Sequence, residues 1–446
     1  MRTDVNRRQF LRSTAALGAA LYVAPEVVGQ SSKPDDLNVA IIGTGTEGQV
    51  LLDSCLKMKG LRFKAVCDIW KAYNQRIAYR RLKAYHHNPN AYEDYREMLD
   101  KEKDLDAVII ATPDFWHSKQ TVACLKAGFN VYCEKEMSNT LEGARKMVEA
   151  ARQSGKLLQI GHQRRSNPRY IYCYGKIIKE AKLLNRITTV SGQWNRSKVA
   201  CEDLGWGGAK YEIEQKTLEQ YGFKSMTQFR NWRWYKGLGG GPIVDLGSHQ
   251  IDIYSWFLGA NPISVIASGG TDYWKEHEWY DNVMVVYEYE TKDGIVRAFY
   301  QTLTTNSSQG YFEAFMGDEG TLTVSEAAGR TAIYREKGVS PDKWQAWVKK
   351  GYIKATVAAE PSNKTGGVLD MRTSPTPPKY DIAVAMDKPF HYPHLENFFD
   401  AVRSGGKVKL NCPAQIGYET AITVLKVNEA VAAARRLDFK PEDFKV

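Results

Sequence analysis

The sequence predicts an α/β fold in two parts: a doubly wound parallel sheet, followed by an open and mainly antiparallel β-sheet of the α+β type. Up to residue 160, short apolar runs typical of buried strands alternate with segments of helical periodicity, as in a parallel sheet covered by helices. After residue 161, aromatic and β-branched residues recur in alternating stretches typical of strands with one exposed face. With 446 residues, 43% of them hydrophobic, the chain is long enough for two such domains.

The first apolar run, residues 37–42, leads directly into three glycines spaced G-x-G-x-x-G. In parallel α/β domains the first glycine permits a tight turn, the second lets a pyrophosphate approach the backbone, and the third lets the next helix pack on the strand. A glycine turn without a ligand is the alternative interpretation. Asp68 favours the first interpretation, because an acid about 20 residues past such a turn holds the ribose hydroxyls of a dinucleotide. The predicted contacts of the turn are Gly43, Thr44, Gly45, Thr46, Glu47 and Gly48.

An acid at position 68 also repels a 2′-phosphate, so the sequence predicts a Rossmann domain that uses NAD rather than NADP. Two further apolar runs, residues 106–112 and 130–133, end in polar residues. The carboxyl ends of parallel strands face the ligand crevice, so these polar residues should surround the nicotinamide. The predicted contacts there are Thr112, Pro113, His117, Glu134 and Lys135, with Gln163 added at the crossing into the second domain.

A glycine-rich segment ending in Pro242 opens a predicted helix that carries Asp245, His249 and Asp252. Spacings of four and three residues place these side chains on one helical face. An otherwise apolar helix buries such groups only if they satisfy each other or meet a polar ligand. A structural hydrogen-bonded ladder is the alternative, and Asp252 suits that role best.

We therefore assign Asp245 and His249 to an active site, together with Lys135. Oxidation of an alcohol requires a base for the hydroxyl proton, and an imidazole has a suitable pKa. His249 is the predicted base, Lys135 polarises the oxygen or relays the proton, and Asp245 orients the pair. This chemistry requires no metal.

The nucleotide-binding domain is placed at residues 30–160, and a substrate-binding α/β sheet domain at residues 161–446. Two insertions interrupt the second domain, at residues 197–235 and 338–389, and predicted helices at 394–403 and 414–435 close it. The first insertion is dense in Trp and Arg, which can stack on sugar rings and donate to hydroxyls, although ordinary packing is an equal alternative. The predicted substrate contacts are Arg164, Trp232, Arg233, Asp245 and His249.

Residues 1–29 predict a twin-arginine export signal. The pair Arg7 and Arg8, followed by Phe10 and Leu11, precedes an apolar run at 13–28 that is too short and interrupted for a stable membrane span. The protein is therefore expected in the periplasm or another extracytoplasmic space. Because this route carries folded proteins, the cofactor can be loaded before export, and it should stay tightly bound where no free nicotinamide pool exists.

Charge and cysteine content argue against two other classes of protein. The formal net charge of +10 is dispersed and accompanied by no nucleic-acid motif, so no nucleic-acid partner is expected. The seven cysteines form no C-x-x-C pair, which predicts buried thiols rather than a disulfide framework or a zinc site.

Four motifs resemble the Gfo/Idh/MocA oxidoreductase family, named for glucose-fructose oxidoreductase and inositol dehydrogenase. They are GTGTEG at residues 43–48, CEKE at 133–136, GHQRR at 161–165 and GGGPIVDLGSHQID at 239–252. The resemblance implies bound NAD, the catalytic trio Lys135, Asp245 and His249, and homodimers or homotetramers formed through the open sheet. The family pattern Glu-Lys-Pro is replaced here by Glu134, Lys135 and Glu136, which adds an acid that could alter the lysine pKa or meet the substrate.

The resemblance further implies a sugar, a sugar derivative or a cyclitol as the substrate. The function predicted first is an NAD-dependent oxidoreductase that oxidises a secondary ring hydroxyl of a sugar or glycoside. The alternative is a redox-neutral glycoside hydrolase or lyase, in which transient oxidation at C3 acidifies the C2 hydrogen, the aglycone is eliminated and the hydride returns. A non-catalytic sugar-binding protein is a third interpretation, but it would not need Lys135 and His249 together.

Overall fold

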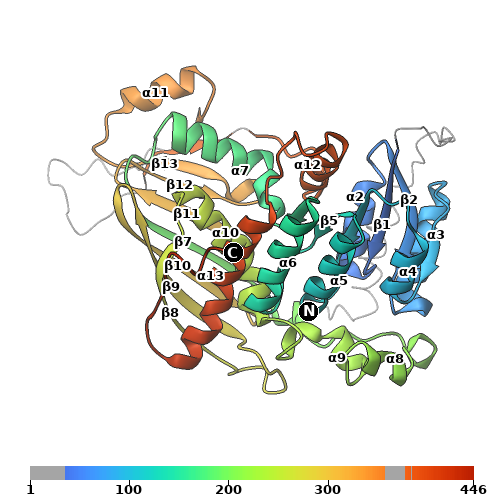
Figure 1. Cartoon of the computed structure of the whole chain (residues 1–446). Coiled ribbons are helices and arrows are strands. Elements are labelled where there is room, and N and C mark those ends of the chain that lie inside the picture. The colour runs from blue at the N-terminus through green and yellow to red at the C-terminus, as the bar shows by residue number, and fades with distance from the viewer. Residues whose placement is uncertain (1–35, 357–376, 383) are drawn as a thin grey trace, which may run out of the picture. The chain divides into compact units, whose positions relative to one another are not determined.

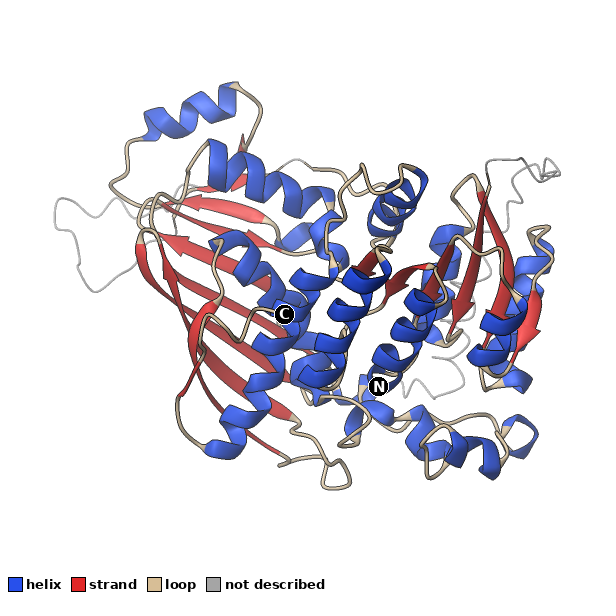
Figure 2. Cartoon of the chain, viewed as in Figure 1, coloured by secondary structure: helices blue, strands red, loops and turns tan. Residues whose placement is uncertain are grey.

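The first sheet of the structure has six parallel strands in the order β3-β2-β1-β4-β5-β6 (Figures 1 and 2). Strand β4 is buried along its whole length, as expected for a strand with helices on both faces. The strands are β1 (Leu37–Ile42), β2 (Leu61–Cys67), β3 (Asn90–Tyr92), β4 (Ala107–Ile110), β5 (Asn130–Cys133) and β6 (Leu158–Ile160). The helices are α2 (Thr46–Cys55), η1 (Lys71–Gln75), α3 (Arg76–Ala84), α4 (Tyr95–Lys101), α5 (Asp114–Lys126) and α6 (Leu141–Ser154).

A computed structural model describes residues 36–356, 377–382 and 384–446. Residues 37–446 form one compact unit that contains both sheets. The predicted export signal at residues 1–29 lies outside the described residues. Among the residues described, no helix is both long enough and apolar enough to cross a bilayer.

The second sheet has ten strands in the order β14-β15-β13-β12-β11-β7-β10-β9-β8-β16. Its neighbouring strands run antiparallel except for β7 and β10, which pair in parallel. The strands are β7 (Ile187–Asn195), β8 (Pro262–Gly270), β9 (Asn282–Thr291), β10 (Gly294–Leu303), β11 (Tyr311–Gly317), β12 (Gly320–Val324), β13 (Ala332–Arg335), β14 (Lys354–Ala355), β15 (Lys379–Asp381) and β16 (Leu437–Asp438).

Helices α10 (Gly241–Leu258) and α13 (Ala414–Ala433) pack together and against one face of the second sheet. Helix α12 (Tyr392–Arg403) instead returns to the first domain, where Leu395, Phe398 and Phe399 join the apolar cluster beneath β1 and α2. The remaining helices of the second domain and its connections are η2 (Gln163–Ser166), α7 (Pro168–Tyr172), η3 (Cys173–Glu180), η7 (Ala328–Arg330) and α11 (Pro341–Lys349).

The first insertion, residues 197–235, which we call the strap, lies beside the Rossmann domain in Figure 1. Its helices are η4 (Lys198–Ala200), η5 (Ala209–Tyr211), α8 (Gln215–Gln220), α9 (Met226–Arg230) and η6 (Trp232–Trp234). The second insertion is ordered at both ends, since α11 buries Trp344 completely and β14 and β15 extend the large sheet. Residues 357–376 and 383 of that insertion lie outside the described residues.

The predicted fold class is confirmed: a parallel Rossmann sheet precedes a separate, mainly antiparallel sheet. The alternating pattern predicts strands at residues 187–194, 263–269, 283–289, 295–303, 311–316 and 320–324, and these agree with β7 to β12 to within one or two residues at each end. All seven cysteines are unpaired and buried, as predicted from their spacing.

Gly48→Ala tests the close packing of α2 on the glycine turn. A Cβ atom at position 48 would lie 2.2 Å from the carbonyl oxygen of Gly43. The helix and the turn would have to separate, so we expect the free energy of unfolding to fall by about 1–3 kcal/mol, as at other overpacked sites. Urea denaturation measures the change.

Gly175→Ala is the matched control, because no other described part of the chain lies within 4 Å of its Cβ position. This substitution should leave stability unchanged or raise it by up to about 1 kcal/mol, since alanine is favoured over glycine inside a helix. Equal denaturation midpoints for Gly48→Ala and the unsubstituted protein would contradict the close contact.

Candidate active site

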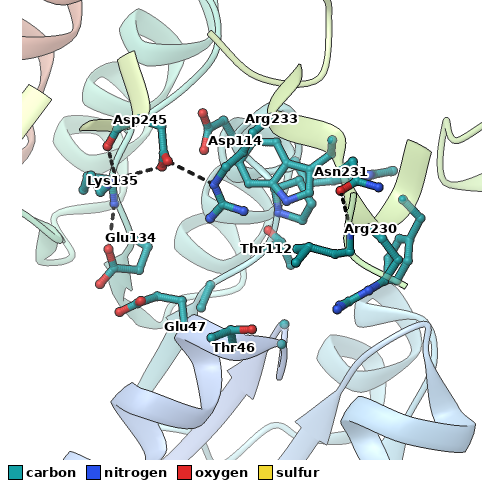
Figure 3. Close-up of a pocket in the computed structure, with 18 of the residues that line it drawn as sticks. Thr46, Glu47, Thr112, Asp114, Glu134, Lys135, Arg230, Asn231, Arg233 and Asp245 are labelled. Atoms are coloured by element: carbon teal, nitrogen blue, oxygen red, sulfur yellow. Dashed lines mark hydrogen bonds and ion pairs between the residues drawn. The ribbon is translucent and has the colours of Figure 1, made fainter. Parts of the chain in front are cut away.

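A cavity of about 640 Å³ lies where the carboxyl ends of the parallel strands face the second domain (Figure 3). The Rossmann domain contributes the glycine turn and the ends of β2, β4 and β5, while α10, the strap and β7 contribute the opposite wall. Of the predicted site residues, those that line the cavity are Gly43, Gly45, Thr46, Glu47, Asp68, Thr112, Pro113, Glu134, Lys135, Gln163, Trp232, Arg233, Asp245 and His249.

The glycine turn has the geometry that a pyrophosphate requires. Gly43 adopts a φ of +84°, and a Cβ atom there would lie 2.5 Å from the carbonyl oxygen of Ala111. At Gly45, by contrast, the nearest atom to a Cβ position is Asn74 Nδ2 at 3.6 Å, so the space above this backbone is open to the cavity. Gly45 is the N-cap residue of α2 and has no side chain to cap it, which leaves the first amides of the helix available to an anion. These residues fit NAD.

Asp68, directly after β2, is fixed by hydrogen bonds from two backbone N–H groups and one hydroxyl. Its Oδ2 accepts from Thr44 N at 2.7 Å and from Thr44 Oγ1 at 3.1 Å, and its Oδ1 accepts from Trp70 N at 2.7 Å. Burial raises the pKa of Asp68, although these hydrogen bonds oppose the shift. Asp68 lines the cavity and would hold the ribose, whereas Thr44 is fully buried and positions Asp68 rather than lining the cavity.

Lys135, after β5, meets Asp245 of α10 across the cavity (Figure 3). Its Nζ donates to the Asp245 carbonyl oxygen at 2.5 Å and to Oδ1 at 3.1 Å, and Arg233 Nε lies 3.2 Å from Oδ2. Burial alone would raise the pKa of Asp245, but the positive charges of Lys135 and Arg233 outweigh it and hold that pKa far below its usual range. Asp245 is therefore a permanent anion that orients two cations.

His249, one helical turn after Asp245, is 8% exposed and lines the cavity. Burial, with the charges of Lys135 and Arg164 nearby, lowers the pKa of His249 well below its usual value. Its Nδ1 has no hydrogen-bond partner among the described residues. The imidazole is therefore neutral and has a free nitrogen, as a proton acceptor must, but the same shift makes it a weaker base than a free imidazole. Asp252 is instead ion-paired with Arg165 at 2.8 Å and accepts from Thr420 Oγ1 at 2.9 Å, so its role is structural.

The prediction that His117 contacts the cofactor directly is not supported. The ring is buried outside the cavity, and its two nitrogens lie 2.7 Å from the carbonyl oxygens of Thr112 and Glu136. Burial lowers the pKa of His117 to about 4. The neutral ring has one N–H and donates to one of these two carbonyl oxygens, so His117 lies between the segments after β4 and β5 rather than in the cavity.

The prediction that Arg164 contacts the substrate is corrected in the same way. Arg164 is 1% exposed, does not line the cavity, and forms ion pairs with Glu313 and Glu326. Its guanidinium also lies 5.5 Å from the ring of Trp194 and 5.3 Å from that of Tyr311. Two carboxylates compensate the buried charge, so Arg164 supports the aromatic wall of the cavity from behind.

Glu134 and Glu136 flank the lysine but differ in their surroundings. Glu134 lines the cavity and accepts from Lys135 N and Tyr132 Oη, both at 3.1 Å. Burial, with Glu47 nearby, raises the pKa of Glu134 to about 8. Glu136 is 1% exposed and lies outside the cavity, so this acid, which replaces the family's proline, does not meet the substrate. Its Oε1 accepts from Met137 N at 2.7 Å, and burial raises the pKa of Glu136 to about 8.

Several residues that line the cavity were not predicted from the sequence. Asp114 follows Pro113 at the end of β4, where the rule for strand ends could have found it. Burial, with Asp245 nearby, raises the pKa of Asp114 to about 7. Trp194 lies one residue before the end of β7, and its ring stacks on Tyr311 at 4.6 Å and lies 5.4 Å from the ring of His249. The other cavity residues not predicted include Arg196, Arg230, Asn231, Glu326, Phe390 and His391.

In the described part of the chain, one group of side chains has atoms close enough together to hold a metal ion. Its members are Glu47, Glu134 and His391, whose possible ligand atoms lie within 4.8 Å of one another. His391 Nε2 is 3.1 Å from Glu47 Oε1. The proton chemistry assigned to Lys135, Asp245 and His249 does not pass through this group.

Comparisons with known proteins agree with this architecture. Residues 37–162 match the oxidoreductase family with the NAD-binding Rossmann fold, and residues 213–323 match the GFO/IDH/MocA C-terminal domain. An inositol 2-dehydrogenase/D-chiro-inositol 3-dehydrogenase of Shouchella clausii is 34% identical over 138 residues, 30% of this chain and 38% of that protein. A glycosyl hydrolase family 109 protein of a Shewanella species is 28% identical over 176 residues, 34% of this chain and 38% of that protein. The matched stretches thus span well under half of both relatives.

Solved structures extend the likeness over nearly the whole chain. GenD2 from gentamicin A biosynthesis, in complex with NAD, has a TM-score of 0.64 at 18% identity and covers 92% of this chain and 98% of its own. Levoglucosan dehydrogenase with NADH and levoglucosan also has a TM-score of 0.64, at 16% identity, and covers 91% of this chain and 99% of its own. At such identities the likeness establishes the fold.

Glu136→Gln should stabilise the protein more at high pH than at low pH. A glutamate in the unfolded chain has a pKa of 4.5, whereas the pKa of the buried Glu136 is about 8. Between these pH values the protein therefore takes up a proton when it folds. The unsubstituted protein therefore loses stability as pH rises through this window, and a glutamine does not. Thermal midpoints at about pH 5 and about pH 8 should differ more between the two proteins at the higher pH.

Glu142→Gln is the control, because that carboxyl is exposed and its pKa is lowered, so it titrates below this window. Its midpoint relative to the unsubstituted protein should not change between the two pH values. If the difference in thermal midpoint between Glu136→Gln and the unsubstituted protein were also the same at both pH values, Glu136 would be ionised in the folded protein.

Proposed function

Because the chain belongs to the GFO/IDH/MocA oxidoreductase family, we propose that it oxidises a secondary ring hydroxyl of a sugar or glycoside. One observation carries the proposal: Lys135, Asp245 and His249 line the same cavity as the glycine turn and Asp68. NAD, when bound, supplies the hydride acceptor. The residues that would hold it include Gly45, Asp68, Thr112 and Glu134.

The catalytic residues divide the proton chemistry among them. The ammonium of Lys135, held by two hydrogen bonds to Asp245, is positioned to donate to the substrate oxygen and polarise the hydroxyl. His249 is neutral and accepts the hydroxyl proton. Asp245 keeps Lys135 and Arg233 in place, because its carboxylate stays ionised between them.

The substrate class is supported by the opposite wall of the cavity. Trp194, Tyr311 and Trp232 line it beside hydrogen-bonding groups such as Arg196 and Asn231. Aromatic faces packed next to polar donors suit the alternating apolar and hydroxyl surfaces of a sugar ring. Relatives and structural neighbours named for inositol, anhydrofructose and levoglucosan act on compounds of this kind.

Redox-neutral cleavage of a glycoside is a second candidate function, and Asp114 favours it. With a pKa of about 7, this cavity-lining carboxyl can carry a proton at neutral pH and deliver it to a departing aglycone. Relatives named for glycosyl hydrolase family 109 are 27–28% identical to this chain over 176 residues. In such a reaction the glycosidic bond is broken and the cofactor ends in its starting state.

A panel of sugars and glycosides separates the two functions. The purified protein is mixed with each compound, and the absorbance of reduced nicotinamide and the release of free sugar are followed together. The first proposal expects lasting reduction without cleavage. Cleavage with the cofactor in its starting state would replace it with the second function.

Lys135→Met and His249→Asn provide the controls for that panel. Each should lower turnover by about 100-fold to 10,000-fold, the usual contribution of a positioned acid or base. Circular dichroism checks that both variants fold. A protein that only binds sugars would show no turnover before substitution and the same sugar affinity after it.

We further propose that the protein reaches an extracytoplasmic space by the twin-arginine route, on the strength of residues 6–12. Replacing Arg7 and Arg8 together by lysine should move the protein from the periplasmic to the cytoplasmic fraction of a bacterial host. Arg2→Lys, outside the pair, should leave the distribution unchanged. Export of the double variant at the original level would contradict the proposal.

A further inference from the structure

The strap crosses from the second domain onto the carboxyl edge of the Rossmann sheet. Trp70, which follows β2, donates its indole N–H to the carbonyl oxygen of Tyr211. Trp116, in the first turn of α5, donates its indole N–H to the carbonyl oxygen of Tyr221 at 3.0 Å. Both tryptophans come from the segments that follow the cavity-lining strand ends of β2 and β4. The strap is therefore attached to the edge at which a dinucleotide binds.

Aromatic packing fixes the strap more firmly than these hydrogen bonds alone. The ring of Phe223 meets that of Phe115 edge-on at 5.4 Å, and the ring of Phe229 meets that of Trp70 edge-on at 5.7 Å. Phe223 is only 2% exposed. Such contacts bury apolar surface between strap and Rossmann domain, so lifting the strap would expose several rings to water at once.

The same strap residues form a wall of the cavity. Tyr221, Phe223, Phe229, Arg230 and Asn231 line it together with Gly45 and Asp68 of the dinucleotide site. In Figure 3 Arg230 and Asn231 lie across the cavity from Thr46. A dinucleotide on the glycine turn would thus be enclosed between the Rossmann sheet and the strap.

Arg230 is a strap cation that lines the cavity and has no carboxylate partner among the described residues. The Cζ atom of Arg230 lies 5.1 Å from the ring centre of Trp70, and the backbone N–H of Trp70 donates a hydrogen bond to Asp68 Oδ1. Arg230 therefore lies at the same end of the cavity as Asp68. Its Nε donates to the carbonyl oxygen of Gly205 at 3.3 Å. Within the described residues Arg230 forms no ion pair, whereas Arg233 is paired with Asp245. A half-buried guanidinium in this position has donors left for the oxygens of an anionic ligand.

We propose that the strap retains NAD through successive turnovers and that Arg230 contacts the adenosine diphosphate half of the dinucleotide. This inference rests on the proposed function in taking NAD as the ligand, but it is independent of the sugar. The second domain would then do two tasks, presenting Asp245 and His249 to the substrate and closing the cofactor site. NAD could leave only when the strap lifts from Trp70 and Trp116.

Release of NADH from the full-length protein tests the role of Arg230. Bound NADH is chased with excess NAD in a stopped-flow fluorimeter, without sugar. Arg230→Ala should release NADH at least ten times faster than the unsubstituted protein, and Arg230→Lys should fall between them. Lys216→Ala is the control, because Lys216 lies exposed in α8 of the same strap and does not line the cavity. Equal release rates for Arg230→Ala and the unsubstituted protein would overturn the assignment of Arg230.

ADP-ribose shows which half of the dinucleotide Arg230 contacts. Its affinity, measured by calorimetry, should fall in Arg230→Ala by a factor similar to that for NADH. A loss for NADH with an unchanged affinity for ADP-ribose would move the contact to the nicotinamide half and overturn the proposal as stated.

Hydrogen–deuterium exchange tests the strap without any substitution. Amides of residues 201–235 should exchange more slowly when NADH or ADP-ribose is bound than in the free protein. Unchanged exchange in a protein that binds NADH would overturn the retention role. If the unsubstituted protein bound neither NADH nor ADP-ribose, the proposed function itself would fail, and this outcome is distinct from the others.

Discussion

The hydrogen bonds between Lys135 and Asp245 join the two halves of the molecule at the place where both are needed. Lys135 lies shortly after β5, and Asp245 lies in the second turn of α10, so each domain brings one charge to the cavity. Both side chains are largely shielded from water, and either charge alone would carry a substantial desolvation cost. The position of α10 is therefore coupled to the end of β5. His249, one turn further along α10, takes its place at the cavity as a consequence of the same contact.

The sequence alone was enough to predict a structural feature wherever neighbouring residues determine that feature. The glycine turn follows from close approach, because Gly43 and Gly48 have no room for a Cβ atom. The strands of the large sheet follow from alternation along a half-exposed surface. The Asp245 and His249 pair follows from helical spacing. In each case a few neighbouring residues determine the outcome, and no distant contact is required to decide it.

Residues whose role depends on a distant partner were predicted less well. Arg164 was expected at the substrate, but Glu313 and Glu326, about 150 positions further along the chain, draw its guanidinium into the interior. His117 was expected at the cofactor, but its ring is buried between two backbone carbonyl groups. His391 reaches the cavity from a segment with no recognisable motif. The docking of the strap depends on indole groups of Trp70 and Trp116 that look, in sequence, like ordinary core residues.

The seven buried cysteines have a consequence for the redox chemistry of the folded chain. Burial raises the pKa of every thiol, so the reactive thiolate is scarce in all of them, including Cys201 at the rim of the cavity. An oxidant that does not enter the cavity meets none of the seven buried thiols. An unfolded chain, by contrast, would expose all seven thiols to random pairing. A protein with this distribution of cysteines is thus best completed in a reducing environment, and once folded it tolerates an oxidising one without forming a single disulfide.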